Sequence, residues 1–383
     1  MTKSDFLRYD PWPSAQYLLE SLEHSVSTTR TIIGNLRQGQ EHVALSANLN
    51  PPHWEFGHLI WFHEFWVHRH GIQTNPSLLP NADALFNSSG IVHDDRWEVQ
   101  LPSLDILLNY FSEVIERSYA ILRSESLTPE QAYFIQLSLY HQDMHNEAYA
   151  YMWQSLAYAW PFERSLGSIA TQNNNNQIRY IDFPESQLQL GSAPHTGFIF
   201  DNEKWQQDVH VPRFSISSHA VSNGEYLEFL ESHYLSGKSV NEYRPAYWKK
   251  EGPIWLERFF DQWQPIDLKA PVRHISAHSA EQYCLWQGVR LPHEHELTIL
   301  HQFPCVGWQP SNLWEWTSTA FMPFEGFSSD PYQDYSAPWF DGKHRVLKGW
   351  SAYTPDYLRR PQFRNFYLSF RNDFFCGFRT CLA

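Results

Sequence analysis

Two histidines one helical turn apart are the first candidates for chemistry in this sequence. His141 and His145 lie in the segment His-Gln-Asp-Met-His-Asn-Glu, and a spacing of four residues places both imidazoles on one face of a helix. Two imidazoles in that arrangement can bind one metal ion. The spacing alone is weak evidence, because a chain of 383 residues with 20 histidines is expected to contain such a pair by chance.

A third histidine comes from an earlier aromatic segment, residues 51–66. His58 lies there among apolar and aromatic side chains, and Gly57 allows another helix to approach closely. A histidine buried inside a helical bundle costs free energy unless a partner satisfies it, and a metal shared with the first pair would do so. From the residues alone, His58 is only slightly favoured over His63.

Three neutral nitrogen ligands would leave coordination positions open. Open positions are typical of catalytic metal sites, whereas four protein ligands usually close a structural site. On iron, a substrate thiolate and dioxygen could occupy them, and zinc-dependent hydrolysis fits the same ligands. Glu147 follows His145 by two residues and therefore points elsewhere on the helix, so it either supports a ligand from behind or lies at the surface.

The segments that must position these histidines are predicted to be helical. Apolar residues recur every three or four positions, and Pro, Asn and Ser mark the starts and stops. Four such helices suggest a bundle. They cover approximately residues 14–37, 52–70, 103–124 and 129–158.

The second half of the chain has a different character. Gly, Pro, Asn and Asp recur at short intervals, and only residues 223–235 and 277–286 look clearly helical. We therefore predict an α+β protein with two domains that divide near residues 160–190, a helical metal-binding domain of residues 1–165 and a loop-rich domain of residues 166–383. The asparagine-rich run 172–177 is predicted to be a surface loop.

The composition argues against some classes of partner. A formal net charge of −14 and the absence of a dense Lys/Arg run disfavour binding to nucleic acid or to an anionic membrane. No segment approaches the roughly 20 apolar residues of a membrane span, and the first residues lack a signal-peptide core, so we expect a soluble cytoplasmic protein. The four cysteines are too few for a disulfide framework and are expected to be free thiols.

Taken together, the motifs resemble those of the ergothioneine sulfoxide synthases and of their relatives, the selenoneine synthases. The resemblance covers nearly the whole chain and depends on the order and spacing of short motifs, each of which is weak alone. In the helical part the motifs are Trp54-Glu-Phe-Gly-His58 and the segment from His141 to Glu147. In the second part they are Val221–Tyr226, Arg290–Pro292, Leu313–Ser318, Pro331–Ser336, His344–Gly349, Phe363–Asn365 and Cys376–Arg379.

The resemblance implies both a fold and a chemistry. The helical part would be a DinB-like four-helix bundle, and residues 166–383 would adopt the formylglycine-generating-enzyme fold, a C-type-lectin-like α+β domain. Members of the family bind Fe(2+) through three histidines, which match His58, His141 and His145, so the resemblance selects His58 over His63. They activate O2 and join a sulfur or selenium donor to imidazole C2 of hercynine, the trimethylated betaine of histidine. Iron would serve as a template for the substrates and as the redox centre.

Further roles carry over from the family position by position. Tyr332 matches the tyrosine that donates a proton or an electron near the iron, and Tyr335 matches a second tyrosine of the pocket. Asn365 matches the asparagine that contacts the betaine carboxylate. Phe366 matches the position beside the trimethylammonium group, which an aromatic ring attracts.

The residues that match the donor site are less uniform. Arg371 matches the arginine that holds a carboxylate of the sulfur donor, and Arg96 aligns loosely with a partner arginine, with a surface salt bridge as an equal alternative. Members that use γ-glutamylcysteine can have Gln where this chain has Met144 and Asp where it has Tyr367. Loss of that Asp removes a partner for the donor's ammonium group, so γ-glutamylcysteine, cysteine and a selenosugar all stay open as donors.

Two other functions fit parts of the sequence. Cys376 and Cys381 could form the copper-binding thiol pair of a formylglycine-generating oxidase of protein cysteine, although an odd separation places two side chains on opposite faces of a regular strand. Alternatively, the second domain could be a non-catalytic ligand-binding scaffold, with the histidines as a structural zinc site. Under the favoured interpretation the partners are small molecules: hercynine, a thiol or selenol donor, and O2.

Overall fold

The computed structural model describes residues 6–124, 126–163, 179–235, 241–305 and 307–383. They fall into two compact units. The first unit comprises Met1–Tyr149, Ala193–Ile199 and Asp330–Asp334, and the second comprises Ala150–Ser192, Phe200–Ser329 and Tyr335–Ala383. The predicted domain boundary at residues 165 and 166 and the asparagine-rich run 172–177 lie outside the described residues.

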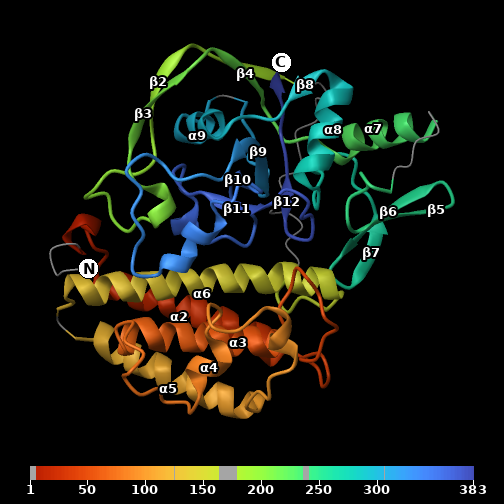
Figure 1. The fold of residues 1–383 in the computed structure, drawn as a ribbon. Coiled ribbons are helices and arrows are strands. Elements are labelled where there is room, and N and C mark those ends of the chain that lie inside the picture. The colour runs from red at the N-terminus through yellow and green to blue at the C-terminus, as the bar shows by residue number, and fades with distance from the viewer. Residues whose placement is uncertain (1–5, 125, 164–178, 236–240, 306) are drawn as a thin grey trace. The chain divides into compact units, whose positions relative to one another are not determined.

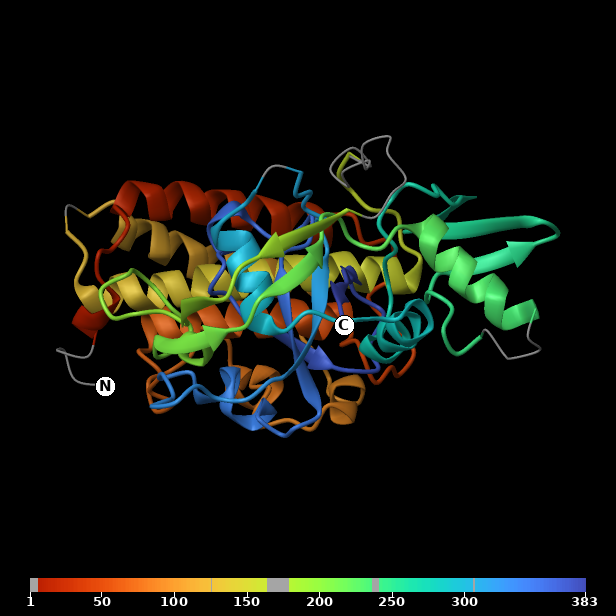
Figure 2. The same cartoon turned by 90° about the horizontal axis from the view of Figure 1, so that it is seen from above.

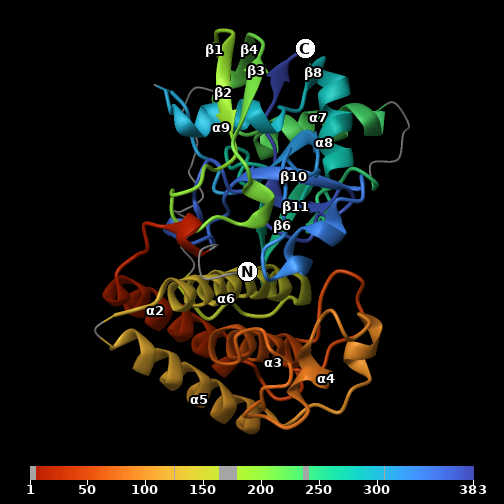
Figure 3. The same cartoon turned by 60° about the vertical axis from the view of Figure 1, so that its left-hand side comes forward.

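Four long helices dominate the first unit and lie alongside one another (Figure 1; Figure 3). The hydroxyls of Ser14 and Ser103 accept hydrogen bonds from backbone N–H groups in the first turns of two of them, which explains where these two helices begin. All four predicted helices are confirmed. They are α2 (Ala15–Gly34), α3 (Pro52–His63), α5 (Leu104–Leu122) and α6 (Pro129–Leu156), and α6 belongs to this unit as far as Tyr149.

The helix predicted over residues 52–70 changes character near its end. Helix α3 ends at His63, and Glu64–His68 form a π-helical turn, η2. The buried Glu64 carboxylate accepts hydrogen bonds of 2.5 Å from Tyr110 Oη and from Ser77 Oγ. These bonds tie α5 and the loop after η2 to the end of α3. The shorter helices of the unit are η1 (Leu7–Tyr9), α4 (Ala82–Phe86) and η3 (Asp94–Trp97).

His63 is buried in this unit and makes the stability of the protein depend on pH. The residue is 1% exposed, and its Nε2 lies 2.8 Å from Ser118 Oγ. Burial, with a smaller contribution from His68, lowers the pKa of His63 to about 3, whereas an unfolded histidine titrates near 6.5. The unfolded chain therefore binds a proton that the folded chain does not, so stability is lost as the pH falls below about 6.5.

Replacing His63 with leucine should reduce this acid sensitivity. When the pH falls from about 7.5 to about 5.5, the unfolding free energy of the wild type should decrease by about 1.4 kcal/mol more than that of His63→Leu. Urea unfolding of the metal-free protein at both pH values measures the difference. Equal losses in the two proteins would contradict the buried, neutral state of His63.

The second unit contains two four-stranded sheets, in the strand orders β1–β4–β13–β8 and β11–β10–β9–β12. Only β12 and β9 pair in parallel among these strands. The first sheet consists of β1 (Tyr180–Phe183), β4 (Phe214–Ser217), β13 (Cys381–Leu382) and β8 (Val289–Arg290), and the second of β11 (Asn365–Leu368), β10 (His344–Gly349), β9 (Trp314–Ala320) and β12 (Cys376–Gly377).

The remaining elements of this unit are a hairpin, a three-stranded meander and three α-helices. Figure 2 shows the meander beside α7. The hairpin is β2 (Ser186–Leu190) with β3 (Gln207–Val211), and the meander is β5 (Trp248–Glu251), β6 (Ile254–Phe259) and β7 (Gln262–Pro265). The helices are α7 (Asn223–Leu235), α8 (Ala277–Gln287) and α9 (Glu294–Gln302), and the 3₁₀ turns of this unit are η5 (Asp201–Glu203), η7 (Ala337–Trp339) and η8 (Asp356–Leu358). The turn η6 (Gln333–Tyr335) begins in the first unit and ends in the second.

The two helices predicted in the second half are confirmed as α7 and α8, but α9 was not predicted. Its first turn is polar, so apolar residues do not recur there at the three- or four-residue spacing that predicts a helix. The Glu296 side chain accepts a hydrogen bond of 2.6 Å from the backbone N–H of His293, so a capping box starts the helix. The α+β class of the chain is confirmed.

Several residues of the C-terminal motifs form buried ion pairs. Arg379 pairs with Glu315 at 2.5 Å and Arg364 with Glu294 at 2.6 Å, and all four side chains are at most 3% exposed. Removing one partner of such a pair would leave an uncompensated buried charge. These motif residues therefore hold the fold together.

No helix in the described ranges combines the length and the apolarity that a membrane span requires. All four cysteines are free, as predicted.

Candidate metal centre

Three imidazoles from two helices of the first unit converge. His58 lies on α3, and His141 and His145 lie on α6. One ring nitrogen of each lies within 4.8 Å of the others, and His141 Nε2 is 3.1 Å from His145 Nε2. Imidazole nitrogens bind zinc at about 2.0–2.1 Å, so small side-chain rotations would bring all three onto one ion. His58 and His141 are buried, whereas the His145 side chain is 17% exposed.

Hydrogen bonds orient two of the three rings. His58 Nδ1 lies 2.8 Å from the backbone carbonyl oxygen of Phe86, which can only accept, so Nδ1 carries the proton. His145 Nδ1 lies 2.5 Å from Glu55 Oε1 and donates to that carboxylate. In both rings Nε2 is therefore left with a lone pair, which is the state of a metal ligand.

The donor set fits a metal ion. His145 Nε2 presents its lone pair to His141 Nε2, while His141 Nδ1 is buried and makes no hydrogen bond within the described part of the chain. Without metal, one proton between the two Nε2 atoms satisfies both of them. A metal ion bound at His141 Nε2 would require that proton to move to His141 Nδ1, so that the ring stays neutral.

Burial keeps two of the candidate ligands, His58 and His141, neutral. It lowers the pKa of His58 to about 3 and holds the pKa of His141 well below its usual value, with His145 adding to both effects. Burial alone would raise the pKa of Glu55, but the charge and hydrogen bond of His145 lower it to about 2. Neutral His58 and His141 beside an ionised Glu55 are protonation states that suit metal binding.

Glu55 is a functional candidate that the sequence analysis did not single out. It is 3% exposed and lies three residues before His58, so it shares the helix face of that ligand one turn earlier. The spacing was the available signal. It could not show that the carboxylate turns to His145 on another helix.

Aromatic rings pack around the histidines. Phe62 stacks on His141 with ring centroids 3.5 Å apart, and Trp54 is parallel to His58 at 5.1 Å. Tyr332, which belongs to the same unit, meets Phe62 edge-on at 4.9 Å and His141 at 6.1 Å. It also lines a cavity of about 220 Å³ with Trp61, Phe65 and others. Tyr332 is thus close to the ligand cluster.

The other predicted site residues divide between the two units. Met144 on α6 and Arg96 on η3 belong to the first unit, and the rest belong to the second. The second group comprises Tyr335, Asn365, Phe366, Tyr367 and Arg371.

Within the second unit these residues make specific contacts. Phe366 stacks on Phe321 at 4.0 Å, and Tyr335 meets Phe366 at 6.2 Å. Arg371 donates to both oxygens of Asp373, at 2.9 and 2.6 Å, and its guanidinium lies 4.8 Å from the Tyr367 ring centroid. The arginine fork is therefore engaged by a carboxylate of the chain itself.

Arg96 is half-buried and faces the ligand helix. Its Nη1 donates to Asn50 Oδ1 at 2.7 Å, and its guanidinium lies 4.2 Å over the Trp54 ring. Its Nη2 donates to the Ser88 carbonyl at 3.4 Å, and no ion pair within 4.0 Å among the described residues involves Arg96, so the surface salt bridge considered from the sequence is not found there.

Two alternatives from the sequence receive no geometric support. His63 lies five residues after His58, about 140° around an α-helix, and turns to Ser118 instead of joining the cluster. Cys376 and Cys381 lie in different sheets, and burial raises the pKa of both thiols. A shared copper site would need two thiolates together.

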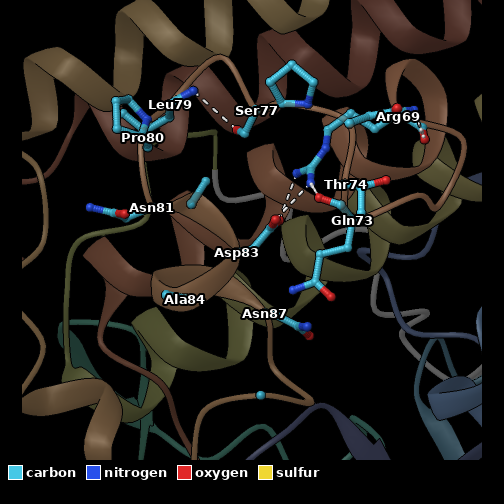
Figure 4. Close-up of a pocket in the computed structure, with 14 residues that line it drawn as sticks. Arg69, Gln73, Thr74, Ser77, Leu79, Pro80, Asn81, Asp83, Ala84 and Asn87 are labelled. Atoms are coloured by element: carbon cyan, nitrogen blue, oxygen red, sulfur yellow. Dashed lines mark hydrogen bonds and ion pairs between the residues drawn. The ribbon is translucent and has the colours of Figure 1, made fainter.

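A larger polar pocket of about 530 Å³ lies in the loop that follows η2 (Figure 4). Its main charged groups pair with each other, since Arg69 Nη1 and Nη2 each donate to Asp83 at 2.7 Å and Nη2 also donates to the carbonyl of Gln73. None of the three clustered histidines lines it. The candidate metal ligands therefore lie outside this pocket.

Both parts of the chain are similar to known proteins. The sulfatase-modifying factor enzyme 1-like domain matches residues 167–299. The chain is 26% identical to the hercynine oxygenase of Mycobacterium tuberculosis and 25% identical to that of Mycolicibacterium smegmatis, in each case over 86% of this chain and 90% of the relative. Ergothioneine biosynthesis protein 1 of Schizosaccharomyces pombe is 30% identical over 44% of this chain and 26% of that protein.

Proposed function

The chain belongs to the family of the hercynine oxygenases, and from that premise we propose that it is an Fe(2+)- and O2-dependent enzyme that forms a carbon–sulfur or carbon–selenium bond at imidazole C2 of hercynine. The observation that carries the proposal is the convergence of His58, His141 and His145. In the described residues the group comprises these three side chains alone, so a bound ion would keep positions for substrates.

The three histidines would hold the iron, and neighbouring residues orient their rings for binding. When bound, iron would supply the template and the redox chemistry with O2. Glu55 and the Phe86 carbonyl keep the Nδ1 protons of His145 and His58 in place, so that Nε2 of each ring is available. Burial by Phe62 and Trp54 excludes water from two of the rings.

The substrate roles rest on the family resemblance. Asn365 would contact the betaine carboxylate, Phe366 would lie beside the trimethylammonium group, and Arg371 would bind a carboxylate of the donor. That carboxylate would have to share or replace Asp373, which engages Arg371 now. Residues 166–383 would thus form the substrate-binding domain, in which Tyr335 would be a second pocket tyrosine.

The positions next to these residues bear on the donor. Tyr367 lacks the carboxylate that would pair with a donor ammonium group, and Met144 stands directly before a ligand histidine. The donors are therefore compared directly in one experiment.

The decisive test incubates anaerobically iron-loaded protein with hercynine, O2 and one donor at a time: γ-glutamylcysteine, cysteine or a selenosugar. We expect one donor to give a product whose mass contains both hercynine and the donor's sulfur or selenium. Metal analysis of the purified protein runs in parallel, because tightly bound zinc without O2 consumption would support a scaffold instead. If hercynine is not consumed with any donor, the betaine-substrate assignment is wrong.

Tyr332 is proposed to donate a proton or an electron during this reaction, because its ring lies against Phe62 and His141. We expect Tyr332→Phe to retain iron but to divert the reaction toward oxidation of the thiol or selenol donor. The ratio of product formed to donor oxidised measures the effect. Tyr119→Phe, on α5, is the control and should keep the wild-type ratio. A wild-type ratio in Tyr332→Phe would remove the role of Tyr332.

A further inference from the structure

We propose that Asn50 and Arg96 are positioning residues of the metal centre. Neither is a candidate ligand, and both belong to the first unit. Together they fix the carboxylate behind His145 and the indole behind His58. The inference rests on the proposed function only in that the three histidines bind a metal ion.

The first arm of this network runs through Glu55. Its Oε1 accepts from His145 Nδ1 and its Oε2 accepts from Asn50 Nδ2, both at 2.5 Å. The carboxylate is thus held from two sides, with one oxygen for the ligand and one for the amide. Fixing both oxygens sets the direction in which the His145 ring can point.

Arg96 sets the orientation of the Asn50 amide. An amide can rotate so that either its oxygen or its NH2 group faces a partner. Arg96 Nη1 donates to Asn50 Oδ1 at 2.7 Å, and because a guanidinium only donates, the oxygen must face it. The NH2 group is then directed at Glu55. Without Arg96, the amide could turn its oxygen to the carboxylate and lose the bond.

The second arm runs through Trp54. The Arg96 guanidinium lies 4.2 Å over the Trp54 ring, whose Nε1 donates to the backbone carbonyl of Leu85 at 2.8 Å. The same ring also contacts His58, at 5.1 Å and 6° from parallel. A cation above the indole thus holds it against the ligand. One arginine thereby acts on ligands from both α3 and α6.

This geometry distinguishes positioning from substrate binding by Arg96. Its Nη1 is used by Asn50 and Trp54 lies 4.2 Å below the guanidinium, while its Nε is buried without a hydrogen bond in the described ranges. A planar guanidinium recognises a carboxylate with two adjacent N–H groups. Because Nη1 already donates to Asn50 and the guanidinium lies over Trp54 on α3, we assign Arg96 to positioning and not to substrate binding.

The test measures metal affinity directly. Asn50→Leu and Arg96→Met are each expected to weaken binding of Fe(2+), and of Co(2+) as a probe, by about 10- to 100-fold, which is the usual cost of losing an outer partner of a metal ligand. Chelator competition gives the affinity, and the visible spectrum of the Co(2+) form reports a changed ligand geometry. The double variant should lose less than the product of the two single losses, because the residues act in one network.

Two further variants control for folding and for charge. Arg123→Met removes an exposed arginine that lies 5.3 Å over Tyr119, and it should keep wild-type metal affinity. Arg96→Lys keeps the charge but loses the planar fork, so it should also bind metal more weakly. Thermal unfolding of each metal-free variant shows whether it folds.

Wild-type metal affinity and Co(2+) spectra in folded Asn50→Leu and Arg96→Lys would overturn the proposal. So would a higher KM for the donor with unchanged metal affinity in Arg96→Lys, since that result assigns Arg96 to the substrate. Weaker metal binding in the variants, in a protein that never consumes hercynine, would support this network while removing the proposed function. The two hypotheses can therefore fail separately.

Discussion

Replacing His141 with alanine is expected to abolish retention of iron(II). The residue supplies one of three converging nitrogens, and its Nε2 lies 3.1 Å from His145 Nε2. Its loss would leave two imidazoles on different helices, so we expect affinity to fall by more than the roughly 10- to 100-fold that an outer partner contributes. Iron bound after anaerobic gel filtration, together with chelator competition, measures the loss.

His63→Leu is the matched control for this variant. His63 is a buried histidine of the same unit, but it lies outside the cluster and contacts Ser118. The control should therefore retain iron. Because His141 also stacks on Phe62 at 3.5 Å, His141→Gln is needed to separate lost packing from a lost ligand. If either His141 variant binds iron as the wild type does, the three-histidine site is wrong.

Replacing Gly57 with alanine is expected to damage both the fold and the metal centre. An added Cβ would lie 2.0 Å from Phe86 Cε1 and 2.3 Å from Phe86 Cζ, and the Phe86 ring is fully buried. The ring must move, and its backbone carbonyl is the hydrogen-bond partner of His58 Nδ1. We expect a loss of about 1–3 kcal/mol in unfolding free energy from overpacking, together with about 10- to 100-fold weaker metal binding.

Urea unfolding of the metal-free protein and chelator competition measure the two effects of Gly57→Ala. Gly34→Ala is the control, because an added Cβ at the end of α2 meets no atom within 4 Å. That variant should be as stable as the wild type or slightly more stable. Gly57→Ala combined with Phe86→Leu should recover part of the unfolding free energy. Unchanged stability and affinity in Gly57→Ala would show that the close contact does not matter.

The segment after η2 contributes more to the metal centre than its lack of candidate ligands suggests. The backbone carbonyls of Leu85 and Phe86 accept from Trp54 Nε1 and His58 Nδ1, at 2.8 Å each. Asp83 accepts from Trp61 Nε1 at 2.7 Å. Three side chains on α3 are therefore held by one short stretch of chain. We infer that substitutions in that stretch would change the affinity for the metal.

Local sequence periodicity was enough to predict the helices and the pair on α6. Apolar spacing gave the four long helices to within a few residues, and the separation of His141 and His145 placed both rings on one face. Both features follow from the geometry of a single helix. The same reasoning failed for α9, where a capping box and tertiary burial outweigh a polar first turn.

The sequence by itself determined the α+β class, the helical position of the paired histidines and, through its motifs, the family. The family motif already favoured His58 over His63, but only the tertiary structure brought His58 together with the pair. It alone decided that Glu55 holds His145 and that Arg96 faces Trp54 and Asn50. The physical reason is that spacing along one helix fixes which side chains share a face, whereas the rotation and packing of two helices against each other depend on contacts between residues far apart in the chain.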